Sequence, residues 1–365
     1  MYKSFTTVNR MRMLKLILLA FAMMLAISCS EKFDAPSEPG ANQQGAVLSK
    51  ENPQVQAVMA VQERHTEKLM ANPNVVGTAV GMTEGGKPAV LVMLKSEIIP
   101  DALEKRAPLP TEIEGVPVVT LVTGEIKSLK GGGGGGGFNP TLKYRPAPNG
   151  VSFGHFNITA GTLGCLVTKG GNTYILTNNH VAADENNASL NDNILQPGPY
   201  DGGQNPGDAI GTLSEYEPIV FSTSASNVID AAIVSVNPAD VTGATADEGN
   251  YGMPSSTIVS AAVGMDVKKC GRTTGCTSTS TSSSREGITG INATVNVGYS
   301  TGTARFVNQI VITKRSFSAG GDSGSLIVNL NDNPVGLLFA GSSTTTIANP
   351  ISAVLSEFNV SIVGD

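Results

Sequence analysis

A serine flanked by glycines near the C-terminus is the residue whose surroundings most suggest covalent chemistry. Ser323 lies in the run Gly320-Gly321-Asp322-Ser323-Gly324. Glycines on both sides let the backbone turn tightly, which exposes the hydroxyl and lets backbone N–H groups point inward. We expect the amides of Gly321 and Ser323 to form an oxyanion hole. An ordinary surface turn is the alternative for such a run taken alone. An α/β-hydrolase elbow fits poorly, because it requires Gly where this chain has Ser325.

A serine nucleophile needs a base that titrates near neutral pH, and histidine is the usual one. The chain has three histidines. His180 follows the apolar run 174–177, so a buried strand would hold it firmly in space. His65 is expected to pack on the apolar face of a predicted helix. His155 has no acidic or serine motif beside it. His180 is therefore the predicted base.

The imidazole needs a carboxylate to fix its tautomer and to stabilise its protonated form. Asp230 lies in the apolar run 227–234, where a strand would bury it. A lone buried carboxylate is costly unless it is paired, and pairing with His180 would offset that cost. Asp201 and Asp208 lie in loops rich in Gly and Pro. Asp184 is too close to His180 along the chain.

Base, acid and nucleophile thus come in the order His180, Asp230, Ser323, which differs from the subtilisin and α/β-hydrolase orders. The segments 175–181, 228–233 and 321–325 resemble the three catalytic blocks of the trypsin-like (chymotrypsin-fold) serine peptidases, especially their bacterial branch. The resemblance covers about residues 150–360. It implies a mainly β protease domain of two six-stranded β-barrels, with no metal and no cofactor.

The resemblance also implies a substrate cleft. Phe317 and Ser318 stand where the family has the base of its specificity pocket, and 339–341 (Phe339, Ala340, Gly341) resemble the strand that pairs with a peptide substrate. Because no acid stands at the pocket base, a small or apolar substrate side chain is expected. In animal trypsins the aspartate before the nucleophile pairs with a freed N-terminal amine, and no segment here resembles that activation site. The bacterial-type alternative implied by the resemblance is that Lys269 or Arg272 pairs with Asp322.

The four cysteines divide into one near the N-terminus and three in the later domain. Cys270 and Cys276 flank a short Gly/Thr turn, so we pair them and leave Cys165 free and buried. Three buried thiols without a bridge remain the alternative.

The N-terminus carries an export signal. A short basic start precedes the apolar run 16–27, which is too short to span a bilayer comfortably, so residues 1–28 are predicted to be a signal peptide. Ser28-Cys29 resembles a bacterial lipobox, which implies that Cys29 carries a lipid anchor. Ordinary signal cleavage at the same bond is the alternative. We expect a protein exported to the bacterial cell envelope and attached to the membrane through Cys29.

Three segments follow the signal. Residues 29–50 are polar and lack periodicity, as in a tether. Residues 51–130 predict a small α/β domain, either a pro-segment or an accessory domain, with a helix over 51–71 and strands over 75–82, 88–95 and 116–122. Seven consecutive glycines make 131–140 a linker. Residues 141–365 carry many short strands with regular turns, as in an all-β barrel, and a closing helix is predicted over 351–358.

Composition limits the partners. The net charge is −6 and only 15% of residues are charged, with no basic patch, so nucleic acid is not expected as a partner. We predict a serine endopeptidase that acts on protein or peptide substrates through an acyl-enzyme on Ser323. The alternatives are a non-catalytic binding protein on a protease scaffold and an esterase of the same fold.

Overall fold

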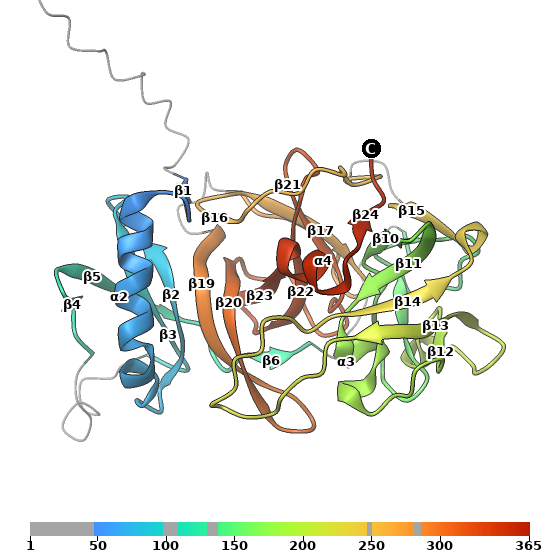
Figure 1. Ribbon diagram of the computed structural model, residues 1–365, viewed down its shortest axis with the longest axis horizontal. Coiled ribbons are helices and arrows are strands. Elements are labelled where there is room, and N and C mark those ends of the chain that lie inside the picture. Colours follow the sequence, from blue (N-terminus) through green and yellow to red (C-terminus); the bar gives the residue numbers. More distant parts are fainter. Residues whose placement is uncertain (1–46, 98–108, 130–137, 247–249, 281–285) are drawn as a thin grey trace, which may run out of the picture. The chain divides into compact units, whose positions relative to one another are not determined.

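The computed structural model describes five stretches of the chain (Figure 1): residues 47–97, 109–129, 138–246, 250–280 and 286–365. The predicted signal peptide, the lipidation at Cys29, most of the tether and the seven glycines lie outside these described residues. Within them, no helix has both the length and the apolar character needed to cross a membrane.

The N-terminal unit, defined here as α2 and β2 to β5, places one helix against a small sheet. Asn52 caps α2 by accepting a hydrogen bond from the amide of Gln54 at 2.8 Å, and proline occupies the first helical position. Buried valines and Leu69 follow the helical repeat and face β2 and β3. The elements are α2 (Pro53–Met70), β2 (Val75–Met82), β3 (Pro88–Leu94), β4 (Glu112–Ile113) and β5 (Val116–Val122).

The first large sheet belongs to the middle of the chain. Its eight strands run in the order β24-β10-β11-β14-β13-β12-β8-β9, and every neighbouring pair is antiparallel. Its strands are β8 (Ser152–His155), β9 (Gly161–Thr162), β10 (Cys165–Lys169), β11 (Asn172–Thr177), β12 (Asn193–Leu195), β13 (Ala209–Tyr216), β14 (Ala232–Val236) and β24 (Ser361–Ile362).

The second large sheet has twelve strands and contains most of the C-terminal part. The helix α4 (Ile351–Phe358) follows its last long strand and matches the predicted closing helix. From this part of the chain come β17 (Val267–Gly271), β18 (Gly275–Ser278), β19 (Gly287–Gly298), β20 (Thr303–Thr313), β21 (Leu326–Asn329), β22 (Pro334–Gly341) and β23 (Thr345–Pro350).

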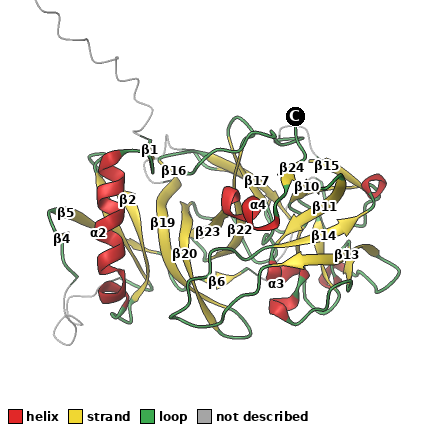
Figure 2. Ribbon diagram, viewed as in Figure 1, coloured by secondary structure: helices red, strands yellow, loops and turns green. Residues whose placement is uncertain are grey.

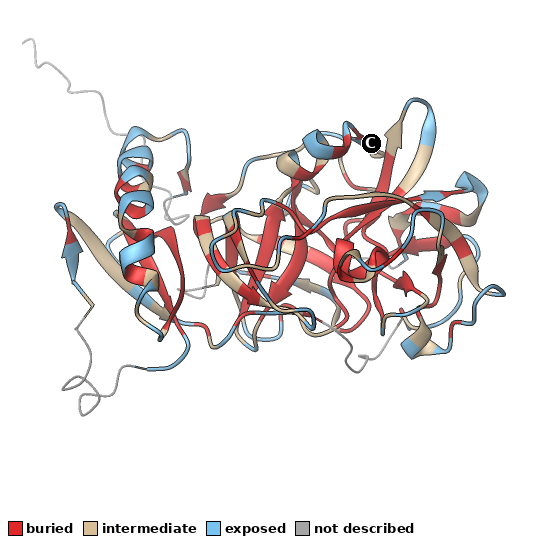
Figure 3. Ribbon diagram, turned by 60° about the horizontal axis from the view of Figure 1, so that its bottom comes forward, coloured by how far each residue is buried: buried red, intermediate tan, exposed pale blue. Residues whose placement is uncertain are grey.

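The predicted fold class is confirmed. The described part is mainly β, and its two large sheets fit a two-barrel arrangement (Figure 2). Buried residues gather where the strands of these sheets face one another, while the loops and one face of α2 are exposed (Figure 3). Side chains from β10, β11, β21 and β22 share one apolar cluster, so the two sheets pack on a common core.

The sheet of the N-terminal unit is continuous with the second large sheet. β2 pairs antiparallel with β19, from Val80 opposite Ile291 to Gly77 opposite Val295. The second large sheet therefore continues through β2 into β3, β5 and β4. The approach is close: a Cβ on Gly77 would lie 2.6 Å from the carbonyl oxygen of Thr294. A further strand, β6 (Lys127–Ser128), then leaves the N-terminal unit and lies against β22.

Candidate active site

The structure brings His180 and Asp230 together at the ends of two neighbouring strands. β11 ends three residues before His180, β14 begins two residues after Asp230, and the strands pair with Thr177 opposite Ala232. The Nδ1 atom of His180 lies 2.6 Å from Oδ2 of Asp230, and the amide of His180 donates to Oδ1 at 3.2 Å. Both side chains are buried. The carboxylate of Asp230 therefore holds both the ring and the backbone amide of His180 in place.

Buried amide side chains hold the backbone of this aspartate. The side-chain amide of Asn178 donates to the carbonyl of Asp230 at 2.7 Å. The amide of Asp230 donates to Oδ1 of Asn349 at 3.1 Å, and Asn349 in turn donates to Gln309 at 2.7 Å. All three amide side chains belong to buried residues. These hydrogen bonds with buried amide side chains hold the backbone of Asp230 in one position.

Tyr299 is a member of this group that sequence reasoning missed. It lies in the turn between β19 and β20, and its hydroxyl donates to Oδ2 of Asp230 at 2.8 Å. Its ring meets the imidazole of His180 edge-on, with centroids 5.8 Å apart. Burial, and then the charge of Asp230, raise the pKa of Tyr299 well above its usual value of 10. The hydroxyl thus stays protonated as a donor. A lone tyrosine in a turn has no sequence signal for this role.

Ser323 lies in a turn that only glycine permits. Gly321 has φ of +99°, and a Cβ there would lie 2.4 Å from Oγ1 of Thr273. A Cβ built on Gly161 would lie 2.4 Å from Val181 Cγ2 and 3.1 Å from the carbonyl oxygen of Ser323. The turn therefore lies beside the residue that follows His180.

The hydroxyl of Ser323 does not bond to the imidazole in this structure. It donates to the carbonyl of Phe339 at 3.2 Å. Nε2 of His180 is buried and has no hydrogen-bond partner among the described residues. An unpartnered buried nitrogen is costly to keep.

Asp322 ties the serine turn to the hairpin of β17 and β18. Its Oδ1 accepts the amides of Thr273 at 2.8 Å and Thr274 at 3.1 Å. Its Oδ2 accepts the Oγ1 hydroxyl of Thr274 at 2.8 Å and the amide of Ala319 at 2.9 Å. These bonds fix the direction of the backbone that precedes Ser323.

Lys269 is the cation that pairs with Asp322. Its Nζ lies 3.2 Å from Oδ2, and both side chains are fully buried. Burial lowers the pKa of Lys269, an effect that the charge of Asp322 opposes. Arg272, the other candidate, pairs instead with Asp201, its Nε donating to Oδ2 at 2.8 Å.

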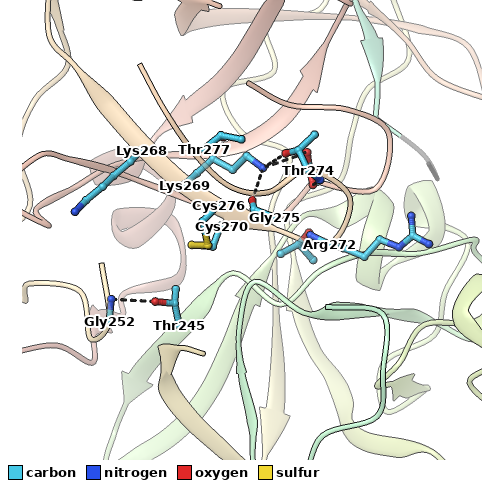
Figure 4. Close-up of a disulfide and its surroundings, with 12 residues drawn as sticks. Thr245, Gly252, Lys268, Lys269, Cys270, Arg272, Thr274, Gly275, Cys276 and Thr277 are labelled. Atoms are coloured by element: carbon cyan, nitrogen blue, oxygen red, sulfur yellow. Dashed lines mark hydrogen bonds and ion pairs between the residues drawn. A yellow bond between two sulfur atoms is a disulfide. The ribbon is translucent and has the colours of Figure 1, made fainter. Parts of the chain in front are cut away.

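A disulfide closes the same hairpin (Figure 4). Cys270 and Cys276 lie directly opposite each other on β17 and β18 and are bonded. Lys269 extends from the neighbouring position to the hydroxyl of Thr274 and the carbonyl of Gly275. Cys165 is free and buried, and burial raises the pKa of its thiol to about 12.

The predicted substrate residues lie in two places, the segment before the serine turn and the end of β22. Phe317 is fully buried, and its carbonyl accepts the hydroxyl of Thr277 at 2.8 Å. The hydroxyl of Ser318 lies 2.6 Å from that of Thr346. Phe339, Ala340 and Gly341 form the buried end of β22.

The other two histidines have carboxylate partners outside this site. His155 is buried, and its Nε2 lies 3.2 Å from Oδ2 of Asp192. His65, expected to pack on an apolar face, is partly exposed, with its Nε2 2.7 Å from Glu114. That glutamate also pairs with Arg64, and the hydrogen bonds from Arg64 and then from His65 lower its pKa to about 2.

Comparisons with known proteins give likenesses in structure only. No family model matches the chain, and no curated protein matches it. A glutamic-acid-specific serine protease that uses a histidine triad in substrate binding is 23% identical, with a TM-score of 0.42 and coverage of 60% of this chain and 100% of that chain. Thermobifida fusca protease A is 22% identical, with a TM-score of 0.42 and the same coverage. A Nocardiopsis protease is 18% identical, with a TM-score of 0.42 and coverage of 59% and 99%. We base the functional proposal on the geometry of the site.

Proposed function

We propose that this chain is a serine endopeptidase that hydrolyses peptide bonds through an acyl-enzyme on Ser323. The observation that carries the proposal is the buried pair of His180 and Asp230, 2.6 Å apart, whose outer nitrogen has no partner among the described residues. Asp230 holds the proton of the imidazole on Nδ1, so Nε2 is free to accept one. That is the state a general base requires.

The chemistry follows from these positions. Ser323 Oγ leaves Phe339, passes its proton to Nε2 and attacks the substrate carbonyl carbon. The amides of Gly321 and Ser323 stabilise the negative charge that develops on the carbonyl oxygen. The imidazolium then gives its proton to the departing amine. A water molecule, activated by the same nitrogen, hydrolyses the ester and frees the serine.

An active-site probe tests this proposal. We expect a fluorophosphonate to label Ser323 in the folded chain and not to label Ser323→Ala, and we expect the labelled protein to lose cleavage of a peptide library. Folded protein that takes no label would favour a non-catalytic binding protein. Labelling together with cleavage of small esters but of no peptide would favour an esterase.

We also propose that the protein is exported and attached to a membrane through a lipid on Cys29. The apolar run 16–27 followed by Ser28-Cys29 supports this. Palmitate labelling in a bacterial host tests it, with Cys29→Ala as the comparison. Equal labelling of both proteins would contradict the anchor.

A further inference from the structure

The chain places its own residues 125–129 along the predicted substrate strand. β6 pairs antiparallel with β22, with Ser128 opposite Ala340 and Lys127 opposite Gly341. Ala340 and Gly341 belong to the end of β22 that the sequence assigns to substrate pairing. Addition of a strand to an open sheet edge is a general mode of peptide recognition. Residues 127 and 128 therefore occupy the place of a bound peptide.

The next residue reaches the proposed catalytic turn. The carbonyl oxygen of Leu129 accepts a hydrogen bond from the amide of Gly321 at 3.0 Å. This amide is one of the two proposed oxyanion donors. Oxyanion donors lie where negative charge develops on the carbonyl oxygen under attack. A carbonyl whose oxygen binds the amide of Gly321 is therefore placed as the one that Ser323 would attack. The peptide register thus marks Leu129 as the residue whose carbonyl reacts.

The side chain of Leu129 occupies an apolar pocket formed by its neighbours in one buried cluster. Leu129 is only 9% exposed and belongs to the apolar cluster that contains Phe317. A Cβ on Gly341 would lie 3.4 Å from Cδ1 of Leu129, so the leucine rests against the bare backbone of β22. An apolar cluster and a bare glycine backbone suit a branched apolar side chain and would leave a charge unpaired.

We propose that the site is selective for leucine and that the chain cleaves itself after Leu129. This inference rests on the proposed function. Ser323 Oγ forms a bond to the carbonyl carbon of Leu129 and its proton goes to Nε2 of His180. The bond to the amine of residue 130 breaks as that amine takes the proton. Water then hydrolyses the ester, leaving a carboxylate on Leu129 and a free hydroxyl on Ser323.

Intact-mass measurement of the full exported chain tests self-cleavage. We expect wild type to yield two fragments divided after Leu129 and Ser323→Ala to remain uncut. Leu129→Asp should slow the cut at least a hundredfold, and Leu129→Met should keep it within about tenfold. Leu142→Asp is the matched control, since Leu142 is 53% exposed and lies outside this pocket. An uncut wild-type chain would overturn self-cleavage, and an equal rate for Leu129→Asp would overturn the selectivity for leucine.

A peptide panel tests selectivity without altering the fold. The probes carry the sequence of residues 123–129 with a reporter amide at the C-terminus and vary only the last residue. We expect wild type to cleave the leucine probe at least tenfold faster than the Asp, Arg and Gly probes. Fluorophosphonate labelling of Ser323 combined with a preference for another residue would overturn the inference and leave the proposed function standing. Absence of labelling and of all cleavage would instead overturn the proposed function.

Discussion

The hydroxyl of Tyr299 donates to the same carboxylate oxygen of Asp230 that holds His180, at 2.8 Å against 2.6 Å for the imidazole nitrogen. Two donors on one oxygen fix the plane of the carboxylate. The orientation of the proposed base therefore depends on a residue from a hairpin of the other sheet. Tyr299 acts through Asp230, as a positioning residue.

Replacing Tyr299 with phenylalanine should lower kcat roughly thirtyfold and leave KM within about twofold. The lost bond joins a neutral donor to a charged acceptor, which is worth about 2 kcal/mol, and it orients the base without touching substrate. Because the pKa of Tyr299 is raised well above 10, the tyrosine keeps its proton, so the wild-type rate should show no alkaline step from it. Steady-state kinetics across pH check this. Tyr174→Phe, on β11, is the control; equal kinetics for both variants would contradict the role.

Replacing Lys269 with methionine should lower kcat about tenfold and destabilise the fold by about 3 kcal/mol. Removing one partner of a buried pair leaves the charge of Asp322 uncompensated beneath the serine turn. Kinetics and denaturant unfolding measure the two effects. Lys268→Met is the control, because Lys268 is partly exposed and pairs with Asp332. A larger effect from Lys268→Met would argue against the pairing with Asp322.

The same lysine gives a pH dependence whose sign can be worked out. Its folded pKa is lowered below 10.5, chiefly by burial, so between that pKa and 10.5 the unfolded chain binds more protons at this site. The unfolding free energy of wild type should therefore rise with pH relative to Lys269→Met in that window. Activity should fall in the same window, because the neutral amine no longer pairs with Asp322. If the unfolding free energy and the activity both rose, or both fell, with pH in this window, the assignment of the effect to Lys269 would be wrong.

Removing the disulfide should cost about 2 kcal/mol of stability, as expected for closing a loop between cysteines six residues apart. Its turn presents the amides of Thr273 and Thr274 to Asp322, so kcat should fall as well. Thermal unfolding of Cys270→Ser/Cys276→Ser, with and without reductant, checks this. Reductant should lower the Tm of wild type and leave that of the double variant unchanged; an equal response of the two proteins would sink the prediction.

Cys165 should resist thiol reagents in the folded protein. Burial raises its pKa to about 12, so almost no thiolate exists at pH 8, and reagents cannot reach the sulfur. Maleimide labelling followed by peptide mapping should find Cys165 modified only after denaturation without reductant. Rapid labelling of the native protein at this position would show that the core around β10 opens.

Local patterns in the sequence were enough to predict the helices and strands and the pairing of Asp230 with His180. The helical repeat of valines predicted α2, and an apolar run that buries one carboxylate predicted the partner of His180. The sequence could not choose between Lys269 and Arg272, because both lie in one hairpin and only packing decides which faces Asp322. It could not reveal Tyr299 either. The pairings of β2 with β19 and of β6 with β22 join segments far apart in the chain, and such contacts leave no local pattern.

The antiparallel pairing of β2 with β19, called here the seam, should hold the two pieces of the chain together after a cut. A nick after Leu129 would break the covalent link and leave the seam intact, so the two pieces should copurify until a denaturant or a competing strand separates them. Departure of the N-terminal unit would uncover the N–H and C=O groups of β19 between Ile291 and Val295, where β2 pairs with it. Bare strand edges recruit other strands. The released barrels should therefore be prone to self-association, which the partner strand prevents while it stays in place.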